Sequence, residues 1–336
     1  PKVMKPTITI LLLITCLSLR AQDVNVHFSQ FYFTPMHHNP ALTGIFEGDI
    51  RAAAVHRRQW QRVPVPYLTF GGSLQGKLEQ SLLKNTQTAL GLTVLHDEAG
   101  DAALSISQVQ VQGAVAKALH PNHVLSVGFQ LAAGQRAFNP DRFRFGSQYD
   151  GEQFNPDLPG ESFERESKAF VSLGGGLNWH IQEADRLSLD IGAGWAHLNR
   201  PALNFTDQAK ESWDALTNAY AMGRYRLRSR LSLRAHLLAR FQGNRREIVG
   251  GAGLLLDVDR QPGKELAIGA GLSHRWEDAL IPYLEVHYRQ WTAGLSFDFN
   301  TSSFRNATSG NGGPEMVLQY TFIRVKPVGV FESCPI

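Results

Sequence analysis

Short segments in which every second residue is apolar recur along this chain. The clearest one covers residues 231–241, where leucine, alanine and phenylalanine alternate with serine, arginine, histidine and a single leucine. Successive side chains of a β-strand point to opposite faces, so such a segment has one apolar and one polar face. A helix would scatter the arginines around its circumference. The alternation therefore predicts an all-β protein.

About fourteen such segments can be placed along the chain, and an even number is typical of single-chain bacterial barrels. Near Ser107 and Gln108 the alternation changes phase, which a β-bulge would produce. The expected strands are residues 49–60, 66–78, 87–96, 102–118, 123–137, 167–181, 186–198, 214–228, 230–242, 246–258, 264–275, 281–289, 291–299 and 315–323.

The connections between these strands alternate in length. The longest are residues 139–166, 199–213 and 300–314. The tightest are residues 120–122, 183–185, 229 and 290. If the strands run up and down in sequence, the long connections all fall on one side and these tight ones on the other. Transmembrane barrels have short periplasmic turns and long outer loops, so the pattern predicts that both termini are periplasmic.

A soluble β-sandwich would show the same alternation, with its apolar face in a dry core. Two features favour a membrane barrel. Glycines gather on the polar face, as at Gly174, Gly176, Gly192 and Gly194, where they would leave room inside a closed barrel. Strands of about ten residues also suit a tilted crossing of a bilayer. We therefore predict a transmembrane antiparallel β-barrel of about fourteen strands with a short N-terminal plug-like segment.

The first residues have the features of an export signal. Met4 and Lys5 precede an apolar run over residues 8–19, and Ala21 stands before a polar stretch. We expect a secretory signal peptide that starts at Met4 and is cleaved after Ala21. A lipoprotein signal with Cys16 as the acylated residue is the alternative. The apolar run is too short for a membrane-spanning helix.

These expectations divide the chain into four parts. Residues 1–21 form the signal peptide, 22–48 an N-terminal periplasmic or plug segment, 49–323 the outer-membrane barrel, and 324–336 a C-terminal tail. The sequence has two cysteines, and after cleavage only Cys334 would remain. An intramolecular disulfide and a thiolate metal cluster are therefore not expected.

Charge and motifs argue against several function classes. The net charge is only +3 over 336 residues and no basic tail exists, so nucleic-acid binding is not expected. We find no G-x-S-x-G elbow, no H-E-x-x-H pair and no Walker loop, and so predict no catalytic residue, cofactor or metal site. His37 and His38 would point apart in a strand, which makes them a poor metal site.

The polar face of the expected strands carries many ionisable side chains that would line the barrel. The candidate lumen residues are Arg224, Arg226, Arg234, His236, Arg240, Glu285, His287 and Arg289. An arginine-rich face would suit an anion-selective pore. The arginines could instead pair with acids such as Asp190 and Glu285 and fill the lumen, and we favour this second interpretation.

Residues 27–44 precede the first strand and are rich in aromatic side chains. Pro35 and Pro40 forbid a long regular helix there. Exposed rings would be costly in water, so we expect the segment to fold into or across the periplasmic mouth. Asn39 and Thr43 are expected to bond backbone groups at the turn into the first strand. The residues expected to seal the pore or bind a partner are His27, Phe28, Gln30, Phe31, Tyr32, Asn39, Pro40 and Gly44.

This same segment carries a family resemblance. Together with three later segments, in the same order, it resembles the PorP/SprF family of type IX secretion and gliding machinery. The matching residues are HFSQFY at 27–32 with Pro35 and residues 39–44; RRQW at 57–60 with PYLT at 66–69; FDFNTSS at 297–303 with Gly312, Glu315 and the last strand; and the tail from Lys326 to Pro335. The resemblance covers the length of the mature chain.

The resemblance implies a non-enzymatic outer-membrane component that assists the export or surface anchoring of secreted proteins. Its implied partners are outer-membrane lipids, periplasmic type IX secretion components, and secreted surface proteins or gliding adhesins. A diffusion porin or ligand channel and an outer-membrane lipid-modifying enzyme remain the alternatives. We expect loop 139–166 to contact cargo, because loops of this length are usually functional or disordered. We expect the last strand to close the barrel against the first.

Overall fold

The computed structural model describes residues 26–60, 67–100, 103–142, 144–149, 151, 153–155, 157–158, 166–205, 212–302 and 305–324. The predicted signal peptide and its cleavage site lie outside these residues. Of the predicted tail, only Arg324 is described.

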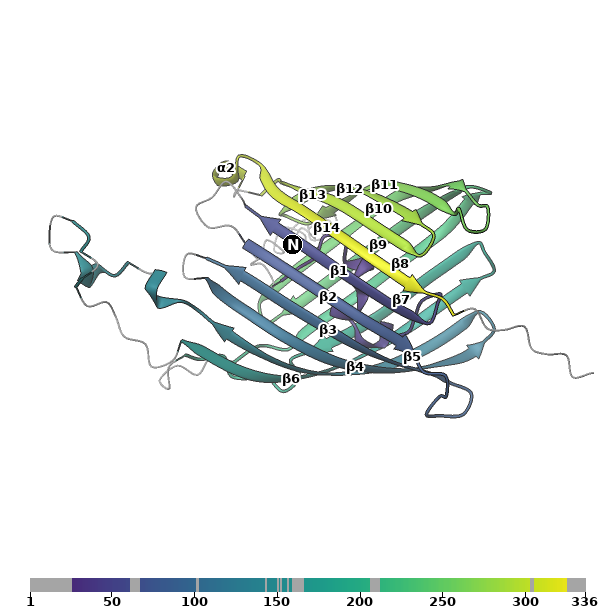
Figure 1. The fold of residues 1–336 in the computed structure, drawn as a ribbon, viewed down its shortest axis with the longest axis horizontal. Coiled ribbons are helices and arrows are strands. Elements are labelled where there is room, and N and C mark those ends of the chain that lie inside the picture. Colours follow the sequence, from purple (N-terminus) through teal and green to yellow (C-terminus); the bar gives the residue numbers. More distant parts are fainter. Residues whose placement is uncertain are drawn as a thin grey trace, which may run out of the picture.

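Within these residues, fourteen strands form one closed antiparallel barrel (Figure 1). Each strand pairs with its neighbours in the chain, and β14 closes the barrel against β1 as predicted. The strands are β1 Ile50–Gln59, β2 Tyr67–Lys77, β3 Gln87–Ala99, β4 Leu104–His120, β5 His123–Ala137, β6 Ser167–Glu183, β7 Leu187–Ala196, β8 Leu216–Arg228, β9 Leu231–Gln242, β10 Arg245–Asp259, β11 Leu266–Arg275, β12 Ala279–Tyr288, β13 Trp291–Asn300 and β14 Asn311–Phe322. The predicted barrel of about fourteen antiparallel strands is confirmed.

The bulge expected near Ser107 in β4 is absent, and that prediction was wrong. β4 pairs with β3 in continuous register through this region. The apparent change of phase arises because Ile106, an apolar residue, points inward, where it packs with Phe170, Leu203 and Trp213. The apolar residue at an inward position was therefore misinterpreted in the sequence as a β-bulge.

Side chains alternate across the wall as a membrane barrel requires. Outward-facing residues are large and apolar, and Phe129 on β5 is 58% exposed. Inward-facing residues are mostly polar and buried, and Gln112 on β4 is only 1% exposed. A polar interior and an apolar exterior are the reverse of a soluble domain and match a barrel surrounded by lipid.

The two ends of the barrel differ. We call the end where β1 begins and β14 ends the terminus end, and the opposite end the loop end. At the terminus end, the hairpins after β4, β6, β8 and β12 are short. The loop end carries the long connections after β5 and β7, and the chain that follows β5 projects far from the barrel there (Figure 1).

The helical turns are short, and none of them is part of the barrel wall. No helix of the described residues is long and apolar enough to cross a membrane. These turns are η1 Phe31–Phe33, η2 Pro35–His37, η3 Pro40–Leu42, η4 Pro140–Arg142, η5 Gly146–Gln148 and α2 Arg305–Thr308.

Candidate functional site

The most distinctive feature of the molecule is the segment over residues 26–48, which we call the N-terminal segment. It consists of the turns η1, η2 and η3 in succession. Pro35 and Pro40 occupy the first positions of η2 and η3, where the fixed φ of proline suits a helical start and its missing N–H is not needed. The Asn39 side chain accepts a hydrogen bond from the backbone N–H of Ala41 at 2.8 Å and so caps η3.

The N-terminal segment runs inside the barrel along its length. Near the loop end, Arg240 of β9 donates to the backbone carbonyl of Val26 at 2.7 Å. At the terminus end, the backbone N–H of Gly44 donates to the Gln75 side chain of β2 at 2.8 Å. Figure 1 shows the segment in purple, enclosed by the strands. The expected location was into or across the periplasmic mouth, and the contacts extend from the terminus end through the interior.

A buried charge network holds the first part of this segment. Arg57 of β1 pairs with Asp298 of β13 at 2.6 Å and with Glu315 of β14 at 3.1 Å. Arg275 of β11 also pairs with Asp298, at 2.8 Å. The hydroxyl of Ser29 donates to Asp298 and accepts from both arginines, so its hydrogen-bonding capacity is used.

Glu315 binds the backbone of the segment directly. Its two carboxylate oxygens accept the backbone N–H groups of Ser29 and Gln30, each at 2.7 Å. Hydrogen bonds to a charged acceptor are stronger than neutral ones. The Glu315 and Arg57 side chains are each 1% exposed, so their pairing is closed to water while the segment is docked.

A second set of hydrogen bonds holds the middle of the segment to the opposite wall. The side-chain amide of Asn39 donates to the backbone carbonyl of Leu177 at 2.9 Å and to the hydroxyl of Tyr220 at 2.8 Å. Asn218 donates to the carbonyl of His38 at 2.7 Å. Asn39 was expected to bond backbone groups at the turn into β1, but its partners lie on β6 and β8.

The predicted glycine-lined interior is what admits the segment. A Cβ added at Gly176 would lie 1.8 Å from the Asn39 side-chain oxygen, and one added at Gly128 would lie 2.3 Å from the backbone nitrogen of Ala41. Real Cβ atoms do not approach so closely. Glycine at these two positions therefore allows direct contact between the segment and the strand backbone.

The aromatic residues predicted to pack on the wall are buried. Phe28 and Phe31 are each 2% exposed. Phe31 meets the His236 ring edge-to-face at 5.5 Å, and Tyr32 lies 4.6 Å from the same ring. Phe28 packs with Val55 and Val317 at the seam between β1 and β14. The rings of the segment thus contact both sides of the barrel.

Most of the predicted lumen residues are found inside, and they pair with acids. Arg234 pairs with Glu285, which also lies 2.9 Å from His287. Arg240 lies 3.8 Å from Glu247 and donates to Asn218. These contacts match the interpretation of a filled lumen.

The remaining lumen candidates lie at the terminus end. Arg226 pairs with Asp185 at 3.3 Å. Arg224 has no side-chain partner among the residues that the structure describes. Arg289 lies in the turn between β12 and β13 with a positive φ of 54°, so it is not a lumen residue of a strand.

Sequence reasoning missed the five residues of the charge network as a group: Ser29, Arg57, Arg275, Asp298 and Glu315. Four of these stand in segments that carried the family resemblance, but nothing in their spacing shows that they meet. Ser29 and Glu315 are 286 positions apart in the chain. Arg275 had no distinguishing signal.

A cavity of about 60 Å³ lies between the segment and residues of β3 to β9. His37 and His38 line this cavity, and burial lowers the pKa of His37 to about 4 and that of His38 well below its usual range. Among the described residues, no group of three or more His, Cys, Asp and Glu side chains could hold a metal ion.

Solved structures with a similar arrangement are known. The Ralstonia pickettii toluene transporter TbuX is 11% identical, with a TM-score of 0.49, and the match covers 86% of this chain and 94% of that one. A Pseudomonas aeruginosa FadL homologue is 13% identical, with a TM-score of 0.47, covering 91% and 96% of the two chains. No curated protein matches the sequence significantly.

A family model covers most of the chain. Residues 20–318 match the model described as type IX secretion system membrane protein PorP/SprF. The matched range includes the N-terminal segment, all five residues of the charge network and thirteen complete strands, and it ends within β14. The chain therefore belongs to the PorP/SprF family of type IX secretion system membrane proteins.

Proposed function

We propose that this protein is a non-enzymatic outer-membrane barrel that assists the export or surface anchoring of proteins secreted by the type IX system. The single observation that carries this proposal is family membership over residues 20–318. Its partners are secreted surface proteins at the loop end and periplasmic secretion components at the terminus end.

The filled interior supports an anchoring role over a diffusion porin. Four buried ionic side chains and several backbone hydrogen bonds tie the N-terminal segment to β1, β2, β6, β8, β11, β13 and β14. A porin needs a continuous water-filled path, and the segment occupies the interior from Val26 near the loop end to Gly44 at the terminus end. We infer that the segment seals the barrel.

The loop end offers a surface for cargo. In the described part of the connection after β5, Tyr149 and Phe154 form an isolated β-bridge, and the Arg144 guanidinium lies 5.0 Å from the Phe154 ring. Tyr149 is 55% exposed. Exposed tyrosine beside arginine is a frequent composition of protein-binding surfaces.

Co-purification tests the anchoring function. The full-length barrel, extracted in mild detergent after cross-linking in cells, is expected to retain a secreted type IX protein. Tyr149→Ser is expected to reduce this retention, whereas Leu82→Ser, a more exposed position at the terminus end, leaves it unchanged. Equal retention by both variants would remove the loop from the proposal, and no retained type IX protein in the unaltered barrel would refute it.

Conductance tests the sealing role of the segment. The double substitution of Phe31 and Tyr32 by alanine removes the rings that pack on His236. A seal predicts a conducting barrel that still retains its periplasmic partners. Loss of those partners from a non-conducting barrel would instead assign the segment to docking. A large conductance in the unaltered barrel would establish the porin alternative.

A further inference from the structure

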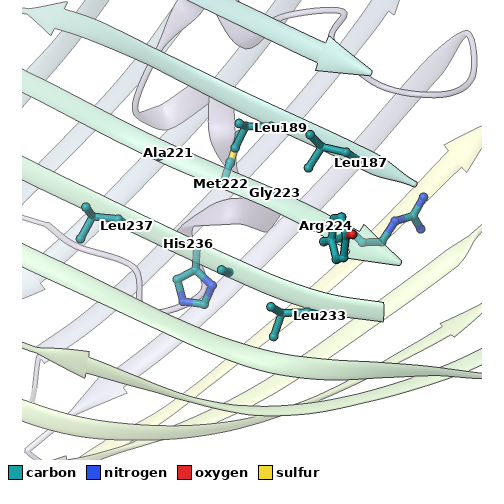
Figure 2. Close-up of a pocket in the computed structure, with 11 residues that line it drawn as sticks. Leu187, Leu189, Ala221, Met222, Gly223, Arg224, Leu233, His236 and Leu237 are labelled. Atoms are coloured by element: carbon teal, nitrogen blue, oxygen red, sulfur yellow. The ribbon is translucent and has the colours of Figure 1, made fainter. Parts of the chain in front are cut away.

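A hollow lies on the outward face of β7, β8 and β9 near the terminus end (Figure 2). Its volume is about 290 Å³. The floor is made by small residues of β8 and β9, namely Ala221, Gly223 and Ala235, and the walls are Leu187, Leu189, Leu233 and Leu237. Because the outward face of the barrel meets lipid, the hollow opens to the membrane.

The hollow is local to these strands. On β5 and β12 the same outward face carries large side chains such as Phe129 and Leu284, which are 58% and 59% exposed. The volume is close to the lower limit of roughly 300 Å³ for ligand pockets, which suits one narrow apolar chain.

Three exposed arginines stand at the terminus end of the hollow: Arg186, Arg228 and Arg230. The Nε of Arg186 donates to the hydroxyl of Tyr225 at 2.9 Å, and Tyr225 lines the hollow. Arg228 faces outward because a register shift in β8 pairs it with the outward-facing Leu231. Two of the three basic groups are therefore directed to the same face as the leucines.

Two of these three arginines have no acidic partner among the residues that the structure describes. Within the described part of the chain, the side chains of Arg228 and Arg230 have no hydrogen-bond or ion-pair partner. The nearby carboxylate of Asp185 is already bound by Arg226, at 3.3 Å.

We propose that the hollow and these arginines bind one anionic glycerophospholipid of the surrounding membrane. One acyl chain lies between the leucines, and the phosphate accepts hydrogen bonds from Arg186, Arg228 and Arg230. A planar guanidinium group can donate two parallel hydrogen bonds to the oxygens of one phosphate. Basic side chains clustered beside a membrane-spanning segment also attract anionic lipids. This proposal goes beyond the proposed function and does not depend on it.

The test is native mass spectrometry of the full-length barrel released from micelles with added phosphatidylglycerol or phosphatidylethanolamine. The barrel is expected to retain one phosphatidylglycerol in preference to phosphatidylethanolamine. Replacing Arg186 and Arg228 by glutamine is expected to weaken phosphatidylglycerol binding by about thirtyfold, since each arginine near a membrane surface contributes roughly a fivefold factor. Arg260→Gln, at another exposed turn of the same end, leaves binding unchanged.

Filling the hollow tests the acyl-chain part. Ala221→Phe is expected to reduce phosphatidylglycerol retention, whereas Ala133→Phe, on the outward face of β5, does not. Heat-modifiable migration confirms that each variant is folded. Equal retention by all folded variants, or equal loss in Ala221→Phe and Ala133→Phe, would overturn the proposal. So would a dimer of the barrel that Ala221→Phe dissociates, because the hollow would then be occupied by a second copy.

Discussion

Replacing Glu315 by glutamine isolates the contribution of the charge network to docking of the N-terminal segment. The carboxylate accepts two backbone N–H groups at 2.7 Å and pairs with Arg57 at 3.1 Å, all in a region closed to water. In the variant, Arg57 keeps Asp298 as its only acid, and Arg275 already shares that carboxylate. Docking of the segment is therefore expected to weaken, while every strand-to-strand hydrogen bond is retained.

The size of the effect follows from the burial of the pair. Removing one partner of a buried ion pair costs about 3–5 kcal/mol, which is roughly two to three and a half powers of ten in an equilibrium constant. Hydrogen exchange of the Ser29 and Gln30 amides, measured on the peptide that contains them, is expected to accelerate by about that factor. The matched control is Glu79→Gln, because Glu79 is exposed and its pair with Arg324 contributes at most about 1 kcal/mol.

Two results would refute this reasoning. Unchanged exchange at Ser29 and Gln30 in a folded Glu315→Gln barrel would mean that the carboxylate does not hold the segment. Equal acceleration in the strands would mean that segment and wall unfold together, so that docking is not a separate equilibrium.

Three further outcomes are expected. Gly176→Ala places a Cβ against Asn39, which should displace the segment and raise single-channel conductance. The control is Gly113→Ala, whose Cβ would meet nothing closer than 3.6 Å and should leave the conductance unchanged. Equal conductance in the two variants would contradict the close-packing argument. Burial lowers the pKa of His37 to about 4, so the docked segment favours the neutral imidazole. The free energy of docking therefore has its full value above about pH 6.5 and falls by up to about 3 kcal/mol as the pH approaches 4. Segment exchange should accelerate on acidification, and less so in His37→Gln; the opposite pH dependence would disprove it. Deleting the chain from Met316 onward removes the closing contact of β14 with β1, so no folded, heat-modifiable barrel should be found in the membrane. Normal insertion of the shortened chain would count against this account.

The barrel was predictable because its cause is local. In a membrane barrel, the side chains of each strand face lipid and lumen alternately, so polarity alternates with a period of two residues. Residues 231–241 show this alternation in the sequence. Even the closing pair of β1 and β14 followed from strand order. Errors arose where an inward position is apolar, as at Ile106, because period alone does not distinguish an internal apolar cluster from a change of phase.

The interior site was only partly predictable. The rings of the N-terminal segment had to be buried somewhere, and glycine-rich inner faces indicated where. Which residues would hold the segment depended on bringing positions such as Ser29, Asp298 and Glu315 together across the lumen. A single sequence contains no signal for such distant contacts between residues of the N-terminal segment and of several strands.

The seam between β1 and β14 has a consequence for the order of assembly. Glu315 and Arg57 stand on the two sides of this seam, and both contact Ser29. Until the last strand arrives, the segment lacks the carboxylate that accepts its backbone, and Arg57 has no Glu315 beside it. Closing the wall therefore completes the site that receives the segment, and docking of the segment can follow as a separate step. In the closed barrel, the pairing of the first strand with the last therefore brings together the carboxylate and the guanidinium that hold the segment.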